Sequence, residues 1–230
     1  MKRLFSSLVT FAAVAIQAGE PAGIAVDALP VIEEPLHVVR HRGEHFQIYT
    51  NWIEPGVWTL YHAHHNDLLA VIAADVTAAS QAPGSEPREQ AAPAGTVLFF
   101  PYADSRVPYV HRVGVRGDGP FVNIGLEFRD PPTAACAKRS PRWGEGRAEA
   151  LVPNRRGQAY RLRLSPDDEI ELPGAGRGLL LVPLGDATLN LGHEMWKATA
   201  GDFRFYEGAR PGRLRNHGDT AATLVLFDAC

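Results

Sequence analysis

The chain is poor in cysteine and carries no strong excess of either charge. Its 230 residues include two cysteines, Cys136 and Cys230, and the formal net charge is -3. Two cysteines do not make a disulfide framework, and whether these two pair with each other stays open. The nearly balanced charge and the lack of a basic run exclude an electrostatic argument for nucleic-acid binding.

No hydrophobic run in the sequence reaches the length of about 20 residues that a membrane-spanning helix needs. Residues 1–18 instead have the pattern of an export signal: Lys2 and Arg3 precede a mostly apolar stretch, and small residues up to Ala18 offer a cleavage site. We therefore predict a periplasmic or secreted protein with no membrane segment in its mature form. An N-terminal helix kept in the fold is the alternative.

Glycine and proline are frequent, with 22 and 18 residues, which favours a chain rich in turns and strands over a helical bundle. Short runs of β-branched and aromatic residues alternate with turn residues, a pattern typical of an antiparallel sandwich or barrel. The stretch 77–94 is rich in Ala, Pro, Ser and Gly and predicts a hairpin at the rim. The predicted strands cover 45–53, 57–65, 68–76, 96–100, 109–115 and 121–128.

The two halves of the chain resemble each other. Residues 116–128 form a Gly-Asp turn that leads into an apolar strand ending with an acid, and residues 216–228 repeat this pattern. Such self-similarity predicts two copies of one β unit. We place the first lobe at 36–130, a linker rich in Pro, Arg and Ala at 131–157, and the second lobe at 158–230.

The pair His62-Ala63-His64 is the strongest chemical signal in the chain. Alternate residues of a strand point to the same face, so His62 and His64 project together while His65 points away. His111 begins a later apolar run and supplies a third imidazole. Three neutral imidazoles form a facial ligand set for one divalent transition metal, such as Zn, Cu, Fe, Mn or Ni. The second half has no such pair, so its copy of the unit is predicted to lack the metal.

These residues resemble the two motifs of the cupin superfamily. Five residues separate Gly56 from the His-x-His pair, and five separate Gly95 from Pro101, ahead of the strand that carries His111. The resemblance implies an all-β fold of two tandem antiparallel β-barrels of the jelly-roll type. It also implies that the three histidines are the metal ligands.

Two departures from these motifs affect the site. The glutamate that the family carries shortly after the histidine pair is missing, because Leu68 and Leu69 stand in its place and the nearest acid is Asp67. Asp67 would reach the site only through a bulge, so the resemblance implies a three-histidine centre. The segment between Pro101 and His111 is longer than in the family, which adds residues near the site.

Three further side chains are predicted to contact a substrate. Arg106 and Tyr109 lie in the lengthened segment, and Tyr61 precedes the histidine pair. The alternative for the tyrosines is a structural role inside the barrel, with a hydrogen-bonded hydroxyl. The histidines before the motif are interpreted as solvated or edge residues. They are His37, His41 and His45.

The ligand set leaves positions open on the metal for water, O2 or a chelating substrate. Cupins that lack the glutamate include iron dioxygenases, so the resemblance implies a metal-dependent enzyme that cleaves a small molecule oxidatively. Zinc in the same site would favour hydrolysis or simple ligand binding, and metal loading after export favours Cu or Zn. The alternative is a non-catalytic protein that binds a small ligand or a metal. Cupins commonly pair through sheet edges, so the resemblance is compatible with a homodimer and leaves the oligomeric state open.

Overall fold

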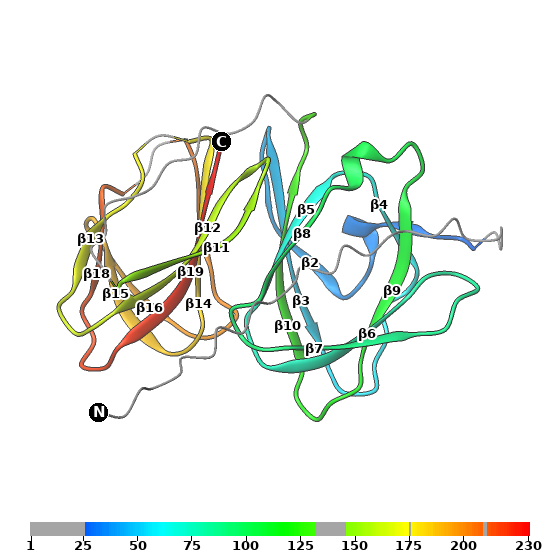
Figure 1. Cartoon of the computed structure of the whole chain (residues 1–230), viewed down its shortest axis with the longest axis horizontal. Helices are drawn as coiled ribbons and strands as arrows, with labels where there is room; N and C mark the ends of the chain where they lie inside the picture. Colours follow the sequence, from blue (N-terminus) through cyan, green and yellow to red (C-terminus); the bar gives the residue numbers. More distant parts are fainter. Residues whose placement is uncertain (1–25, 132–145, 175, 209–210) are drawn as a thin grey trace, which may run out of the picture.

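The structure is a computed structural model that describes residues 26–131, 146–174, 176–208 and 211–230. These residues are mostly β-strand, with two short 3₁₀ helices, η1 (Val31–Glu33) and η2 (Tyr102–Asp104). The strands form two lobes that stand side by side, each built from two sheets (Figure 1). The predicted all-β fold of tandem antiparallel lobes is confirmed.

The first lobe has an inner sheet, next to the second lobe, and an outer sheet on the far side (Figure 1). Neighbouring strands are antiparallel, except that β1 pairs in parallel with β4. The inner sheet has the order β2 (His37–Arg42), β3 (Phe46–Ile53), β10 (Phe121–Phe128), β5 (Asp67–Ile72) and β8 (Val97–Phe100). The outer sheet has the order β1 (Leu29–Pro30), β4 (His62–His64), β9 (Tyr109–Val115), β6 (Val76–Gln81) and β7 (Arg88–Ala92).

The second lobe repeats this strand order, as the self-similarity of the sequence predicts. Its strand β11 (Ala148–Asn154) lies inside the stretch 131–157 that was expected to be a linker, and it pairs with β12 (Gly157–Leu164). The second inner sheet therefore begins at Ala148 rather than at 158. That sheet has the order β11 (Ala148–Asn154), β12 (Gly157–Leu164), β19 (Ala222–Ala229), β14 (Gly178–Pro183) and β17 (Arg204–Glu207). The outer sheet has the order β13 (Glu169–Glu171), β18 (Arg213–Asn216), β15 (Ala187–Leu191) and β16 (Glu194–Ala198).

The two inner sheets pack against each other through one apolar core. Alternate residues of each inner strand face either their own barrel or the other lobe. Ile48 and Leu126 of the first lobe belong to the same buried cluster as Leu180 and Phe227 of the second. Each such side chain contributes about 2 kcal/mol on burial, so the second lobe stabilises the sheet on which part of the site is built.

Several predictions concern residues that the structure does not describe. The export signal over 1–18 and Cys136 lie outside the described residues, whereas Cys230 is disulfide-bonded. Within the described ranges, no helix has both the length and the apolar character needed to span a membrane.

Candidate metal site

The antiparallel pair β4 and β9 brings the three predicted histidines together. His62 and His64 occupy alternate positions of β4, and His111 on β9 lies opposite His62 in the register. One nitrogen from each ring lies within 4.8 Å of the others, and the Nε2 atoms of His64 and His111 are 3.1 Å apart. His62 and His64 are buried, whereas His111 is partly exposed. We call these three residues the histidine cluster.

Backbone and side-chain oxygens hold the other nitrogen of two of these rings. His62 Nδ1 donates to the Leu60 carbonyl at 2.9 Å, and His64 Nδ1 donates to Glu127 Oε1 at 3.0 Å. A carbonyl and a carboxylate only accept, so both Nδ1 atoms carry the proton and both Nε2 atoms offer a lone pair. Such partners orient a ligand ring and raise its basicity.

Burial keeps the imidazoles of His62 and His111 neutral. Burial, followed by the neighbouring rings of His37 and His64, lowers the pKa of His62 to about 3. The pKa of His111 lies well below its usual value, again chiefly because of burial and then because of the rings of His64 and His62. His111 Nδ1 lies 2.9 Å from the Ser80 hydroxyl. A neutral imidazole is the form that binds a metal ion, so the rings of His62 and His111 are in the form that a metal site needs.

The donor set fits a divalent transition metal. Imidazole nitrogen suits Zn, Cu, Fe and Ni, and two such ligands on a tetrahedral ion lie roughly 3.3 Å apart. The 3.1 Å between the Nε2 atoms of His64 and His111 is close to this spacing. The assignment of the three residues as metal ligands remains a prediction, with the geometry in its favour.

Glu127 is an acidic residue of the site that the sequence reasoning missed. It is buried on β10, opposite Gln47 of β3, and Gln47 Nε2 donates to its carboxylate. Its negative charge beside His64 would offset part of the charge of a bound divalent ion. Three neutral ligands alone would leave that charge uncompensated. A signal was present in β10, because polar Asn123 and Glu127 share one face of a strand that is otherwise apolar.

His37 is buried next to the cluster, so its interpretation as a solvated residue is wrong, although it begins β2, which is an edge strand of the inner sheet. Its ring centroid lies 4.6 Å from that of His62, and its Nδ1 donates to Glu34 at 2.6 Å. Glu34 also accepts the amide of Leu60, whose carbonyl holds His62. Burial acts to raise the pKa of Glu34, but these hydrogen bonds outweigh it and the pKa is lowered. Glu34 therefore stays a carboxylate that supports the cluster.

The predicted substrate residues lie in different surroundings. The ring of Tyr109 is 4.9 Å from that of His111. Tyr61 packs under the guanidinium of Arg112, which lies 5.2 Å from its ring centroid. Arg106 is exposed in the loop after η2. The structure thus places Tyr109 against the cluster, whereas Tyr61 contacts Arg112 and Arg106 faces solvent.

Tyr102 is a second aromatic neighbour that sequence reasoning missed. Its ring stacks on His64 at 5.2 Å between centroids and on Tyr109 at 4.9 Å. Burial is the main cause that raises its pKa, so the phenol stays protonated and can donate a hydrogen bond. No local pattern predicts this contact, because it depends on how η2 folds back over the barrel.

Known structures resemble this one in fold, although their sequences differ widely. AerE from Microcystis aeruginosa aligns with a TM-score of 0.54 and 10% identity over 86% of this chain and 98% of its own. A cupin 2 conserved barrel domain protein from Leptotrichia buccalis aligns with a TM-score of 0.53 and 8% identity over 90% and 92%. The chain has the two-lobed cupin fold.

Another protein of similar structure is an enzyme. A mutant of salicylate 1,2-dioxygenase from Pseudoaminobacter salicylatoxidans, in complex with gentisate, aligns with a TM-score of 0.56 and 13% identity over 80% of this chain and 69% of its own. The sequence itself matches no family model and no curated protein. The comparisons therefore confirm the cupin resemblance at the level of the fold.

Asp67, the acid nearest to the missing cupin glutamate, does not join the histidine cluster. Its carboxylate is fully buried and accepts hydrogen bonds from Arg155 and Arg156. Burial acts to raise the pKa of Asp67, but these bonds and the Ala103 amide outweigh it and the pKa is lowered. His65 is exposed, as the strand alternation predicts. Neither residue changes the three-histidine set.

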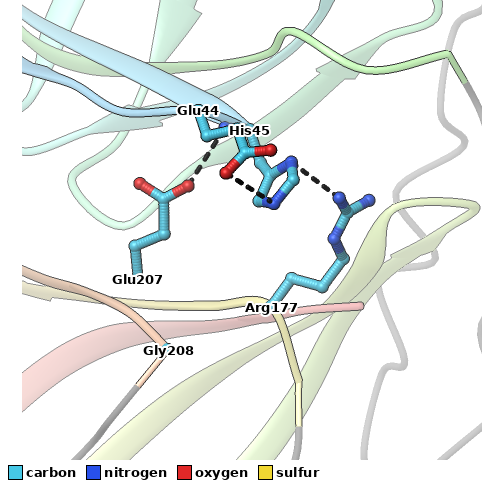
Figure 2. A pocket seen from close by; sticks show the side chains of 5 residues that line it. All are labelled: Glu44, His45, Arg177, Glu207 and Gly208. Atoms are coloured by element: carbon cyan, nitrogen blue, oxygen red, sulfur yellow. Dashed lines mark hydrogen bonds and ion pairs between the residues drawn. The ribbon is translucent and has the colours of Figure 1, made fainter.

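Of the remaining two early histidines, His45 lines an open hollow between the lobes, and His41 contacts Glu207, which also lines it. The hollow has a volume of about 530 Å³, and Figure 2 shows its lining residues. The His45 amide donates to Glu207 at 3.0 Å, and Arg177 donates to His45 Nδ1 at 2.7 Å. His41 Nε2 lies 2.9 Å from Glu207. Both histidines are partly exposed and connect the lobes. The lining residues are Glu44, His45, Arg177, Glu207 and Gly208.

Proposed function

We propose that the first lobe of this cupin binds one divalent transition metal through His62, His64 and His111, and that the protein is a metal-dependent enzyme acting on a small molecule. The observation that carries the proposal is the cluster of three imidazoles, each with its Nδ1 atom next to an oxygen atom of another residue. Oxidative cleavage of the dioxygenase type is the reaction that we favour.

The residues around the cluster have separable roles in this proposal. Glu127 orients His64, and Glu34 orients His62 through the backbone of Leu60. The stacked rings of Tyr102 and Tyr109 form an aromatic wall beside the histidines. When bound, the metal would supply a Lewis acid that can hold a chelating substrate and O2 together. The aromatic wall would orient the substrate and exclude water.

Two observations support dioxygenase chemistry over the alternatives. No carboxylate of the described residues joins the histidine cluster as a potential ligand, so a bound ion would keep positions open for substrate and O2. The fold neighbour that is a salicylate 1,2-dioxygenase was solved with gentisate, which makes aromatic hydroxy acids the first substrate class to test. Their flat rings also match the flat surface of the aromatic wall.

Metal content and O2 uptake test the proposal together. The full chain is analysed by plasma mass spectrometry, loaded with Fe²⁺ without air, and mixed with gentisate or salicylate in an oxygen electrode. We expect about one metal ion per chain and uptake of O2 in proportion to substrate consumed. The His62→Ala/His64→Ala variant should keep its circular dichroism and lose both properties.

The other outcomes are equally informative. Metal binding without O2 uptake for any aromatic, diketone or thiol substrate would favour the non-catalytic alternative, a protein that binds a small ligand or metal. Equal metal content in the wild type and the variant would contradict the site.

We also propose that the protein is exported, since residues 1–18 have the pattern of a secretory signal. Fractionation of cells that produce the full chain tests this proposal. We expect the mature protein outside the cytoplasm, with its N-terminus near residue 19 when sequenced. A cytoplasmic protein with its first residues intact would contradict it.

A further inference from the structure

Asp67 joins the two lobes next to the histidine cluster. It begins β5 of the first lobe, and Arg155 holds it with two hydrogen bonds, Nη2 to Oδ1 at 2.7 Å and Nε to Oδ2 at 3.0 Å. Arg156 Nε adds a bond to Oδ2 at 2.6 Å. Both arginines stand in the turn between β11 and β12 of the second lobe. Paired bonds from one guanidinium fix both partners in orientation.

Arg155 also holds the short helix η2. Its Nη1 donates to both carboxylate oxygens of Asp104, at 2.6 and 2.8 Å. The amide of Ala103 donates to Asp67 Oδ1 at 3.1 Å. Two of the three residues of η2 are thus tied to the Arg155–Asp67 pair. A single 3₁₀ turn has little stability of its own, so these outside contacts set its position.

The remaining residue of η2 is Tyr102, which reaches the cluster. Its ring lies over His64 with 30° between the two planes, and it is nearly parallel to Tyr109, at 9°. Because Tyr102 and Asp104 belong to one turn, a shift of η2 would move the Tyr102 ring away from His64. The chain of contacts runs from the second lobe to the aromatic wall without a break.

We propose that Arg155 is a positioning residue for the small-molecule site, because it fixes η2 and thereby places Tyr102 beside His64. The inference rests on the proposed function in taking the histidine cluster as the ligand site. It assigns the second lobe, which lacks the histidine pair, a part in ligand binding. The aromatic wall that would contact the ligand belongs to the first lobe, but the position of its Tyr102 ring depends on Arg155 of the second lobe.

The ring position of His64 tests the structural part without any metal. Stacking on Tyr102 shifts the carbon-bound ring protons of His64 in the NMR spectrum of the metal-free protein. We expect Asp104→Ala and Arg155→Ala to move these signals, and Tyr102→Leu to move them in the same direction. Asp104 is 60% exposed, so its variant removes one contact of Arg155 without threatening the fold. Unmoved His64 signals in both the Asp104 and Arg155 variants would overturn the proposal.

Ligand binding tests the functional part. The probe is 4-nitrocatechol, a coloured chelating phenol, titrated into Co²⁺-loaded protein without air. We expect Arg155→Ala to weaken probe binding about tenfold, with Co²⁺ affinity unchanged, and Arg155→Ala/Tyr102→Leu to add little to the single variants. Arg161→Ala is the matched control, because Arg161 also reaches the first lobe, at the Gly95 carbonyl, but contacts no residue of η2 in the part of the chain described.

The possible failures can be told apart. A wild type that binds no Co²⁺ or no probe contradicts the proposed function, and the His64 signals then decide the positioning role alone. A wild type that binds both, with an Arg155→Ala variant that binds the probe equally well, contradicts only the positioning role. Fully additive effects of Arg155→Ala and Tyr102→Leu contradict it as well.

Discussion

The two lobes of this cupin-fold chain share strand order and register but differ in what fills their barrels. In the first lobe, Asn51 of β3 lies opposite Asn123 of β10, and both are buried. In the second lobe, the same positions of β12 and β19 hold Leu162 and Leu224. A polar interior costs stability unless every group is paired, whereas leucines contribute through burial. The interior of the first barrel is therefore polar at these two positions, whereas the interior of the second barrel is packed with leucine.

The contrast continues at the histidine cluster. His62 lies opposite His111, and at the matching place Leu172 donates its amide to the carbonyl of Gly212 at 3.0 Å. The second lobe nevertheless keeps Gln158 and Asp228 in the register positions of Gln47 and Glu127. A glutamine and an acid at these two positions therefore do not by themselves distinguish a lobe with a candidate metal site. Among the described residues, the lobes differ in the three histidines, which only the first lobe places beside this pair.

The largest expected effect comes from replacing His62 with leucine, the residue type that stands at the matching position of the second lobe. His62→Leu removes one of the three proposed ligands, so we expect metal content to fall to below about a tenth of the wild-type value. Plasma mass spectrometry of the purified protein measures this. His65→Leu is the control, since His65 is exposed and lies beside the cluster in sequence. Full metal content in His62→Leu would show that the histidine cluster is not what distinguishes the first lobe from the second in metal binding.

Asp67 has no acidic counterpart in the second lobe, where Gly178 stands at the same register position. Asp67→Asn leaves Arg155 and Arg156 without their buried carboxylate, so we expect the free energy of unfolding to drop by about 3 kcal/mol. Urea denaturation measures it. Glu149→Gln, which alters an exposed partner of Arg161, should change the value by less than about 0.5 kcal/mol. Equal effects of the two substitutions would refute the special role of Asp67.

Glu127 and Asp228 occupy matching positions, so the same chemical change can be made in each lobe. Glu127→Gln weakens the acceptor that orients His64, and we expect metal affinity to fall about 10- to 100-fold. Asp228→Asn should leave metal affinity unchanged, because the proposed site takes all of its ligands from the first barrel. Competition with a coloured chelator gives both dissociation constants. A loss of affinity in Asp228→Asn would show that the lobes are not independent in metal binding.

The smallest expected effect is a pH dependence at the contact between the lobes. The pKa of Asp67 is lowered in the folded protein from its ordinary value of 3.8. Its contribution to stability is therefore complete above the ordinary value and is lost as the pH falls through the lowered one. The difference in unfolding free energy between wild type and Asp67→Asn should be constant from about pH 5 to 7 and shrink below about pH 4. A difference that stays constant in acid would contradict this.

Side-chain positions that depend on residues close in sequence could be predicted. Contacts that form only when distant strands close the barrel could not be predicted. Alternation places His62 and His64 on one face, and glycine spacing pointed to the cupin fold. Glu127, Glu34 and Tyr102 reach the cluster from three other elements, which sequence spacing does not order. The strand β11 was missed because its proline and arginine neighbours resemble a linker, while its pairing with β12 decides its structure.

Anomalous diffraction at the absorption edge of the bound metal tests the central claim most directly. Crystals of the full chain, purified with its native metal, should give one strong peak per chain in the first barrel. The peak should lie about 2.0–2.2 Å from the Nε2 atoms of His62, His64 and His111, with no peak in the second barrel. A metal peak elsewhere, for example between His41 and Glu207, with none at the three histidines, would contradict the account.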